Sequence, residues 1–188
     1  MIVTARFIIA SLIGAAAALA ASHPIDAAKS KMTVYVGKAG AFSAFGHDHE
    51  ISAPIAAGEV DPDAHRVELT VRSASMKVLD PKASEKDRAD VQKSMVGPEV
   101  LDVEKYPEIR FRSTGAEQSG GSWTVKGELT LHGQTQAVTV TVKEQAGHYV
   151  GSGKIKQTDF GITPIKAAGG TVKVKDELRI DFDIQLAR

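Results

Sequence analysis

Two closely spaced histidines, His47 and His49, are the residues of this chain whose types and spacing could do chemistry. In an extended strand, both imidazoles project to the same side, together with the apolar residues that flank them. Two imidazoles on one face can ligate zinc or another divalent metal, with His65 or His132 as the candidate third ligand. Two alternatives stay open. One histidine packs and hydrogen-bonds while the other is exposed, or the pair contacts the polar tip of a ligand.

The rest of the sequence offers no catalytic constellation. It has no cysteine, which excludes thiol catalysis, thiolate metal sites and iron–sulfur clusters. It shows no glycine-rich phosphate loop, nucleophile elbow or carboxylate pair with recognisable spacing. Basic and acidic residues each number 23, so nothing predicts electrostatic binding to nucleic acid. We therefore expect a protein that is not an enzyme and has no cofactor or resident metal. The net charge of the chain is near zero, which permits an uncharged ligand.

The stretch Trp123 to Lys143 contains the clearest strand pattern of the chain, and such strands must hold the side chains of any functional site. Two runs alternate between apolar and polar residues, and His132-Gly133 lies in the short polar break between them. Alternation over this length, with β-branched residues, is typical of half-buried strands, and the glycine suits a tight reversal. We predict an antiparallel hairpin with one apolar face. A lone hairpin is only marginally stable, so further strands must cover that face.

The remaining segments supply those strands and one helix. The helix is predicted over Ala83 to Val96, with Asp80 as its N-cap and Gly97-Pro98 as its end. Other strands are predicted at Met32–Val36, Phe42–Ile51, Ile55–Val60, Arg66–Val78, Glu108–Ser113, His148–Gln157 and Leu178–Leu186. The fold class is therefore all-β with one short helical excursion. About eight antiparallel strands can form a sandwich or a closed barrel, and composition does not separate the two.

The first residues have the features of a secretory signal peptide. An apolar run from Phe7 to Ala20 follows the single charge of Arg6, and small residues surround a cleavage site near Ala20 to Ser22. The run is too short to span a bilayer. We expect a leader at 1–22, one domain at 23–188, a periplasmic or secreted location, and no integral membrane segment after cleavage.

Three linked motifs resemble one known family. They are DRADVQKSMVGPEVLDVEKYPEIRF at 87–111, GELTLHGQT at 127–135 and DFGI at 159–162. In this order and spacing they are similar to the YceI-like family of secreted polyisoprenoid-binding proteins. The order Asp87-Arg88 and the cluster Gly46-His47-Asp48-His49 depart from the family pattern.

The resemblance implies an antiparallel lipocalin-like β-barrel with an elongated apolar cavity. The implied partner is an apolar isoprenoid lipid or a quinone, bound by removal of apolar area from water. The residue pattern alone leaves open a filled, ligand-free barrel with a structural or stress-protective role. Related barrels often pair, which implies a homodimer as a further expectation. Candidate ligand-binding residues, chosen by alternation around the cavity, are Phe45, His47, His49, Ile51, Leu69, Val71, Val91, Met95, Phe111, Leu129, Phe160 and Phe182.

Overall fold

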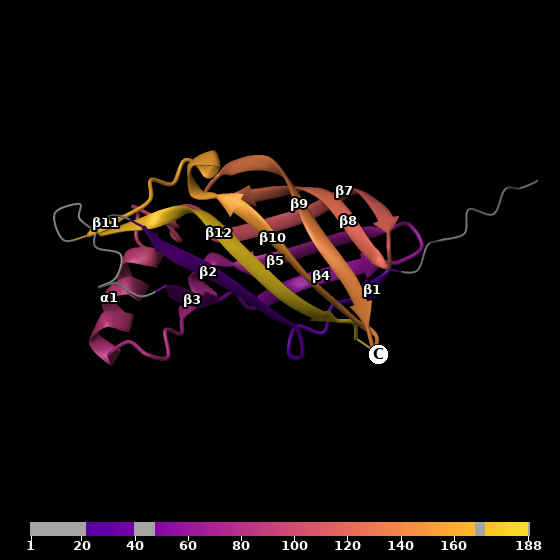
Figure 1. The fold of residues 1–188 in the computed structure, drawn as a ribbon, viewed down its shortest axis with the longest axis horizontal. Helices are drawn as coiled ribbons and strands as arrows, with labels where there is room; N and C mark the ends of the chain where they lie inside the picture. The colour runs from indigo at the N-terminus through magenta and orange to yellow at the C-terminus, as the bar shows by residue number, and fades with distance from the viewer. Residues whose placement is uncertain (1–21, 40–47, 168–171, 188) are drawn as a thin grey trace, which may run out of the picture.

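The chain folds into one strongly curled antiparallel sheet with a single α-helix at one end (Figure 1). The computed structural model describes residues 22–39, 48–167 and 172–187. Within these residues the sheet has twelve strands, and the predicted class is confirmed. The sheet has three strands more than the nine predicted segments, and three of its strands have only two residues each.

The elements follow one another in a regular order along the chain. The strands are β1 (His23–Pro24), β2 (Lys31–Ala39), β3 (His49–Ser52), β4 (Ile55–Asp61), β5 (Arg66–Arg72), β6 (Lys77–Val78), β7 (Glu108–Ser119), β8 (Ser122–Leu131), β9 (Gln134–Gln145), β10 (His148–Lys156), β11 (Lys166–Ala167) and β12 (Val172–Gln185). The helices are η2 (Ser73–Ser75), α1 (Glu85–Val96) and η3 (Gln157–Phe160). The sheet order is β1-β4-β5-β7-β8-β9-β10-β12-β2-β3-β6, with β11 beside β12.

The predicted hairpin forms the centre of the sheet as β8 and β9, with Val125 opposite Val140. The residues at its reversal, His132 and Gly133, both have positive φ angles, 50° and 72°. Two consecutive residues of this conformation match the twist of the flanking strands. The β9–β10 reversal has the same feature at Ala146 and Gly147. These tight turns place consecutive long strands side by side, so that their apolar faces form one concave surface.

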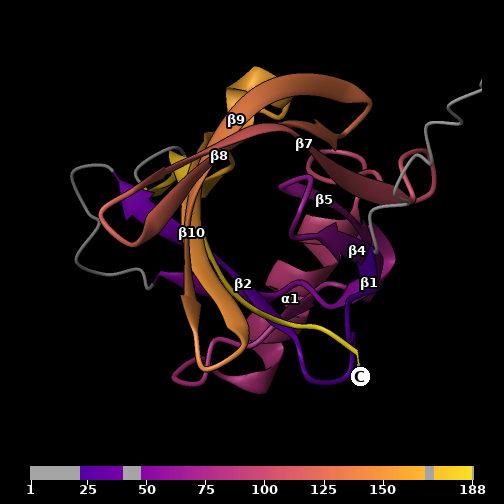
Figure 2. The same cartoon turned by 90° about the vertical axis from the view of Figure 1, so that its right-hand side faces the viewer.

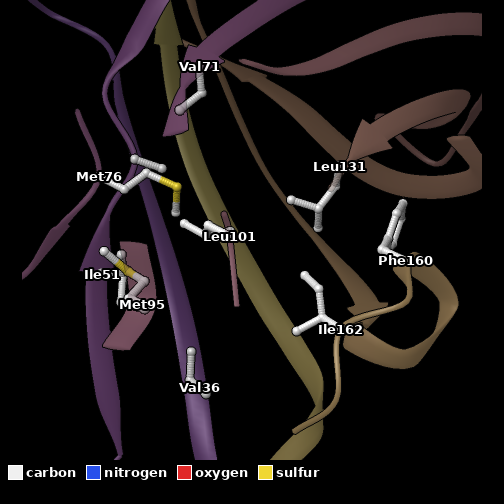
Figure 3. Packing of buried hydrophobic residues seen from close by; sticks show 10 residues of the cluster. Val36, Ile51, Val71, Met76, Met95, Leu101, Leu131, Phe160 and Ile162 are labelled. Atoms are coloured by element: carbon white, nitrogen blue, oxygen red, sulfur yellow. The ribbon is translucent and has the colours of Figure 1, made fainter. Parts of the chain in front are cut away.

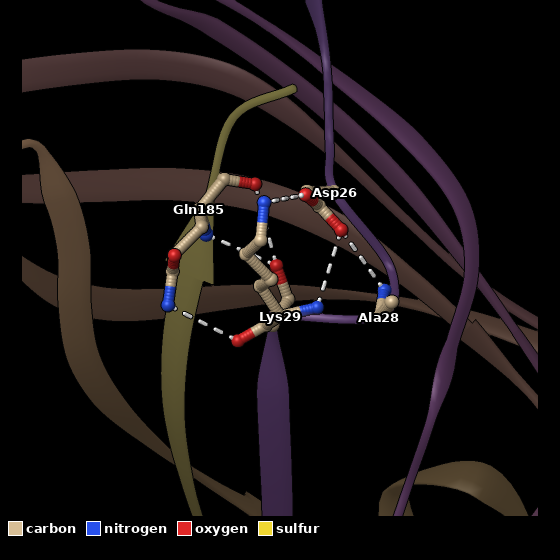
Figure 4. A network of polar contacts seen from close by, with 5 residues as sticks. Asp26, Ala28, Lys29 and Gln185 are labelled. Atoms are coloured by element: carbon tan, nitrogen blue, oxygen red, sulfur yellow. Dashed lines mark hydrogen bonds and ion pairs between the residues drawn. The ribbon is translucent and has the colours of Figure 1, made fainter. Parts of the chain in front are cut away.

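A network of hydrogen bonds joins the two sides of the curled sheet near the chain termini (Figure 4). The backbone N–H of Asp26 donates to Gln185 O at 2.8 Å, and Gln185 N–H donates to Ser30 Oγ at 3.0 Å. Lys29 Nζ lies 2.8 Å from the Asp26 carboxylate and lowers the pKa of that carboxyl group. The contacts close the barrel at this end, because Asp26 follows β1 and Gln185 ends β12.

The excursion between β5 and β7 differs from its prediction in two respects. The expected single strand Arg66–Val78 is broken by the 3-10 turn at Ser73–Ser75. The helix begins later than expected, and its N-cap is Ser84, whose Oγ accepts from Asp87 N–H at 3.1 Å. Asp80 does not cap the helix, because its carboxyl group is engaged with β3. Helix α1 lies across one end of the barrel in both views (Figures 1 and 2).

Gly127 on β8 is required by the close approach of a cavity-facing aromatic side chain. A Cβ atom there would lie 2.5 Å from the Phe111 ring and 2.7 Å from Arg112 O. The ring can shift, but the strand backbone cannot yield without breaking the β7–β8 ladder. We expect Gly127→Ala to lower the free energy of unfolding by about 1–3 kcal/mol, as overpacking does.

The matched control for this prediction is Gly115→Ala on the neighbouring strand β7, where nothing lies within 4 Å of the new Cβ. Its effect should stay within about 0.5 kcal/mol. Chemical denaturation of both variants measures the difference. Equal stability of the two variants would show that β8 does not approach Phe111 and β7 this closely.

Candidate ligand-binding cavity

The barrel encloses a cavity of about 460 Å³, within the usual range for small-molecule sites. Its wall consists of the inward residues of the long strands, which alternate with exposed polar residues such as Glu128 and Thr141. On β8 the wall runs from Trp123 to Leu131, roughly 26 Å along the strand at about 3.3 Å per residue. The cavity is therefore elongated and almost wholly apolar.

The two ends of the cavity differ in burial. At the helix end it is lined by Met76, Met95 and Leu101, each only 6–7% exposed. We call these three residues the cavity floor. At the opposite end the lining includes the exposed residues His65 and Arg66 from the β4–β5 turn. The cavity is thus lined by buried side chains at the α1 end and by exposed ones at the opposite end. Figure 2 views the barrel from that opposite end.

Most of the described residues that alternation selected as ligand-binding do line this cavity, on strands from several parts of the sheet. They are Ile51, Leu69, Val71, Met95, Phe111, Leu129 and Phe182. Phe45 and His47 lie outside the described residues. The structure therefore brings together side chains that are more than a hundred residues apart in the sequence, and whether they contact a ligand remains a proposal.

Two of the predicted lining residues are placed elsewhere, which corrects the prediction for them. Phe160 lies in the 3-10 turn η3, 1% exposed, and packs with Ile162 in the main core cluster. The turn carries the chain out of the sheet, so strand alternation does not apply to it. Val91 is half-buried on α1 but does not reach the cavity, because only the last turn of the helix, at Met95, faces it.

His49 is also displaced from the cavity, and its partner explains why. Its Nδ1 lies 2.7 Å from Asp80 Oδ2, and the other oxygen of Asp80 accepts from Glu50 N–H at 2.7 Å. Asp80 is 2% exposed. This pair fastens the segment before α1 to the edge of β3. The proposed third metal ligands are also engaged, since His65 packs against Trp123 and His132 against Tyr106.

In the described ranges, no group of three or more metal-ligating side chains comes together. The hypothesis of a metal centre that uses both His47 and His49 concerns a residue outside those ranges. It gains no support from the geometry around His49.

The open end carries polar and aromatic groups that alternation did not select. We call His65, Arg66, Trp123, Glu144 and Tyr149 the cavity mouth. The rings of His65 and Trp123 are 4.5 Å apart between centroids. Trp123 could have been found, because it continues the apolar face of β8. His65 could not, since it lies in a turn with a positive φ of 52°.

Burial raises the pKa of the Tyr149 hydroxyl above its usual value, and the nearby Glu144 carboxylate adds to the effect. Tyr149 is therefore a hydrogen-bond donor at neutral pH. Because the folded chain disfavours the phenolate, its contribution to stability holds below the ordinary tyrosine pKa of about 10 and is lost as the pH rises through the raised pKa. An ultraviolet titration should show a late tyrosine ionisation that Tyr149→Phe removes. A titration that is unchanged in Tyr149→Phe would contradict the placement of this ring.

Comparisons of the sequence and of the structure with known proteins agree with one another. Residues 24–186 match the YceI-like domain. The chain is 31% identical over 166 residues to a UPF0312 protein of Serratia proteamaculans, with 82% of each chain covered. It is 30% identical over 163 residues to a UPF0312 protein of Photorhabdus laumondii, covering 80% of this chain and 81% of that one. The crystal structure of Burkholderia cenocepacia BcnA has the same fold, with a TM-score of 0.65, 22% identity, and coverage of 87% and 99%.

The curled sheet and its apolar cavity define a barrel-type binding protein of lipocalin-like architecture. Within that class, the chain belongs to the YceI-like family. The resemblance found in the sequence motifs is thereby confirmed. Among the described residues, no helix combines the length and apolar character needed to cross a bilayer.

Proposed function

We propose that the protein is a non-enzymatic carrier or sequestering protein for the apolar tail of a lipid of isoprenoid type, such as a quinone or a polyprenyl species. The observation that carries the proposal is the shape and chemistry of the cavity, which is long and apolar, with buried apolar residues at one end and polar residues at the other. Such a tail binds by leaving water, at about 0.8 kcal/mol per buried methylene, and needs few polar groups. The side chains of the cavity wall are the proposed contacts of the tail.

The mouth suits the polar end of such a ligand. Tyr149 offers a protonated hydroxyl group, and Trp123 offers an amphipathic ring beside the solvent. We propose that the tail points toward the floor and that the polar end stays among these residues. The proposal also includes export of the chain by a leader at 1–22 and function of the remaining domain in the periplasm or outside the cell.

The only tryptophan of the chain lines the cavity, which provides a direct test. We expect the emission of Trp123 to shift on titration of the mature protein with an all-trans prenyl alcohol, and to saturate at a one-to-one ratio. A short-chain alcohol with the same head is the control and should leave the emission unchanged. An emission that no prenyl alcohol alters would contradict the proposal.

A further inference from the structure

The cavity floor comes from a segment outside the barrel wall, the excursion between β5 and β7, and the η3 segment adds Gln157 and Ile162 to the cavity lining. Met76 follows η2, Met95 lies in the last turn of α1, and Leu101 lies in the turn after it. Figure 3 shows the three side chains gathered beside Ile51. The barrel strands set the width of the cavity, and the excursion lines its α1 end.

Hydrogen bonds hold the two ends of the excursion together at its base. Ser73, which is 1% exposed, donates from its Oγ to Tyr106 O at 2.7 Å. Its backbone N–H donates to Pro107 O at 3.0 Å. The chain thus leaves β5 and returns to β7 through a closed neck, which fixes where Met76 enters the cavity.

The helix that carries Met95 is fastened to the strand beside Met76. The side-chain amide of Gln92 donates to Met76 O at 3.0 Å and accepts from Val78 N–H at 2.8 Å. The side-chain amide of Gln92 therefore hydrogen-bonds to backbone groups at the free edge of β6, as a neighbouring strand would. Together with the Asp80 contacts to β3, these bonds make the floor a fixed barrier.

We propose that Met76, Met95 and Leu101 set the longest apolar chain that the cavity accepts. The inference rests on the proposed function, in which the cavity holds such a chain. Each further methylene that enters the barrel should raise affinity about fourfold, the equivalent of about 0.8 kcal/mol. The gain stops where the chain meets the floor, so a plot of affinity against chain length has a break. Truncating a floor methionine moves that break, whereas truncating a wall residue does not.

The test uses linear primary alcohols of increasing chain length, with the emission of Trp123 as the readout for the mature protein. We expect Met76→Ala and Met95→Ala each to move the break toward longer chains by about the length of the removed side chain. Leu101→Phe adds bulk at the same place and should move it toward shorter chains. Circular dichroism and a thermal melt establish that each variant is folded.

Met32→Ala is the matched control, because it removes the same atoms from the wall of the same cavity. Met32 lies on β2 opposite Phe182 and packs against a second core cluster of Ile25, Ile55 and Ile184. It should weaken binding of the alcohols that extend past it without moving the break, because it packs against the same cluster as Tyr149 of the mouth.

The outcomes separate the inference from the function on which it rests. If the wild-type protein binds the alcohols but the break stays in place in all floor variants, the inference is wrong and the proposed function stands. If the methionine variants do not fold, Leu101→Phe alone tests the inference, since the break in its affinity plot either moves to a shorter chain length or stays in place. If the wild-type protein binds no alcohol of any length, the proposed function fails and this inference fails with it.

Discussion

A Val140→Trp variant is expected to fold normally and to lose its apolar ligand. Val140 lines the cavity from β9, so an indole there takes the space that the tail would occupy. Excluding roughly four methylenes costs about 3 kcal/mol, which corresponds to a loss of affinity of more than a hundredfold. Native mass spectrometry of the variant with an added prenyl alcohol measures the loss, because it needs no fluorescence from the new ring.

The matched control for this prediction is the next residue of the same strand. Thr141 is exposed on the outer face of the barrel, and Thr141→Trp adds the same side chain away from the cavity. It should bind like the wild type. Equal binding by the two variants would mean that the ligand site is not inside the barrel.

Of the substitutions proposed for this protein, Asp80→Ala is expected to lower the free energy of unfolding the most. The substitution removes the acceptor for Glu50 N–H and the partner of His49 at a place that is 2% exposed. It also puts alanine at a positive φ of 26°. A buried group that loses a hydrogen-bond partner costs about 1–3 kcal/mol, and the 21% exposure of the His49 side chain reduces the cost of losing its contact with Asp80. We expect a total of about 2–4 kcal/mol, or roughly 10 °C in Tm, measured by denaturant and thermal unfolding.

An exposed aspartate in another turn provides the control for Asp80. Asp63→Ala should change the free energy of unfolding by less than about 0.5 kcal/mol. Asp80→Asn keeps an acceptor and tolerates the left-handed backbone, so it should lie between the two. Wild-type stability of Asp80→Ala would contradict the role of this residue in fastening the floor segment to β3.

The strands of the barrel could be predicted because each has one buried and one solvated face. The last strand alternates from Leu178 to Ile184, and the structure places that stretch within β12. The hairpin is marked by its glycine and by β-branched residues. Alternation also separated inward from outward side chains, which is why Phe111 and Leu129 were expected in the cavity wall that they form.

Of the three floor residues, Met95 was expected in the cavity, but Met76 could not be predicted from alternation. Val67, Leu69 and Val71 face inward, so counting in twos would turn Met76 outward. The 3-10 turn at Ser73–Ser75 changes this count and returns Met76 to the interior. Nothing in the local sequence marks that turn, because it is fixed by the distant Tyr106 and Pro107.

The role of Asp80 was misread for a related reason. An aspartate before Pro81 has the local features of a helix N-cap. The carboxyl group instead reaches a strand thirty residues earlier, and Ser84 caps the helix. Local propensity favours two solutions here, and the tertiary contact to β3 decides between them.

The measurement that tests the central claim most directly is native mass spectrometry of the mature protein without a tag, followed by organic extraction and lipid analysis. The account predicts a one-to-one complex whose extracted component has the mass of an isoprenoid lipid and is absent from Val140→Trp. A ligand-free protein that also fails to take up added isoprenoid lipid would contradict it, as would a bound species that survives in Val140→Trp.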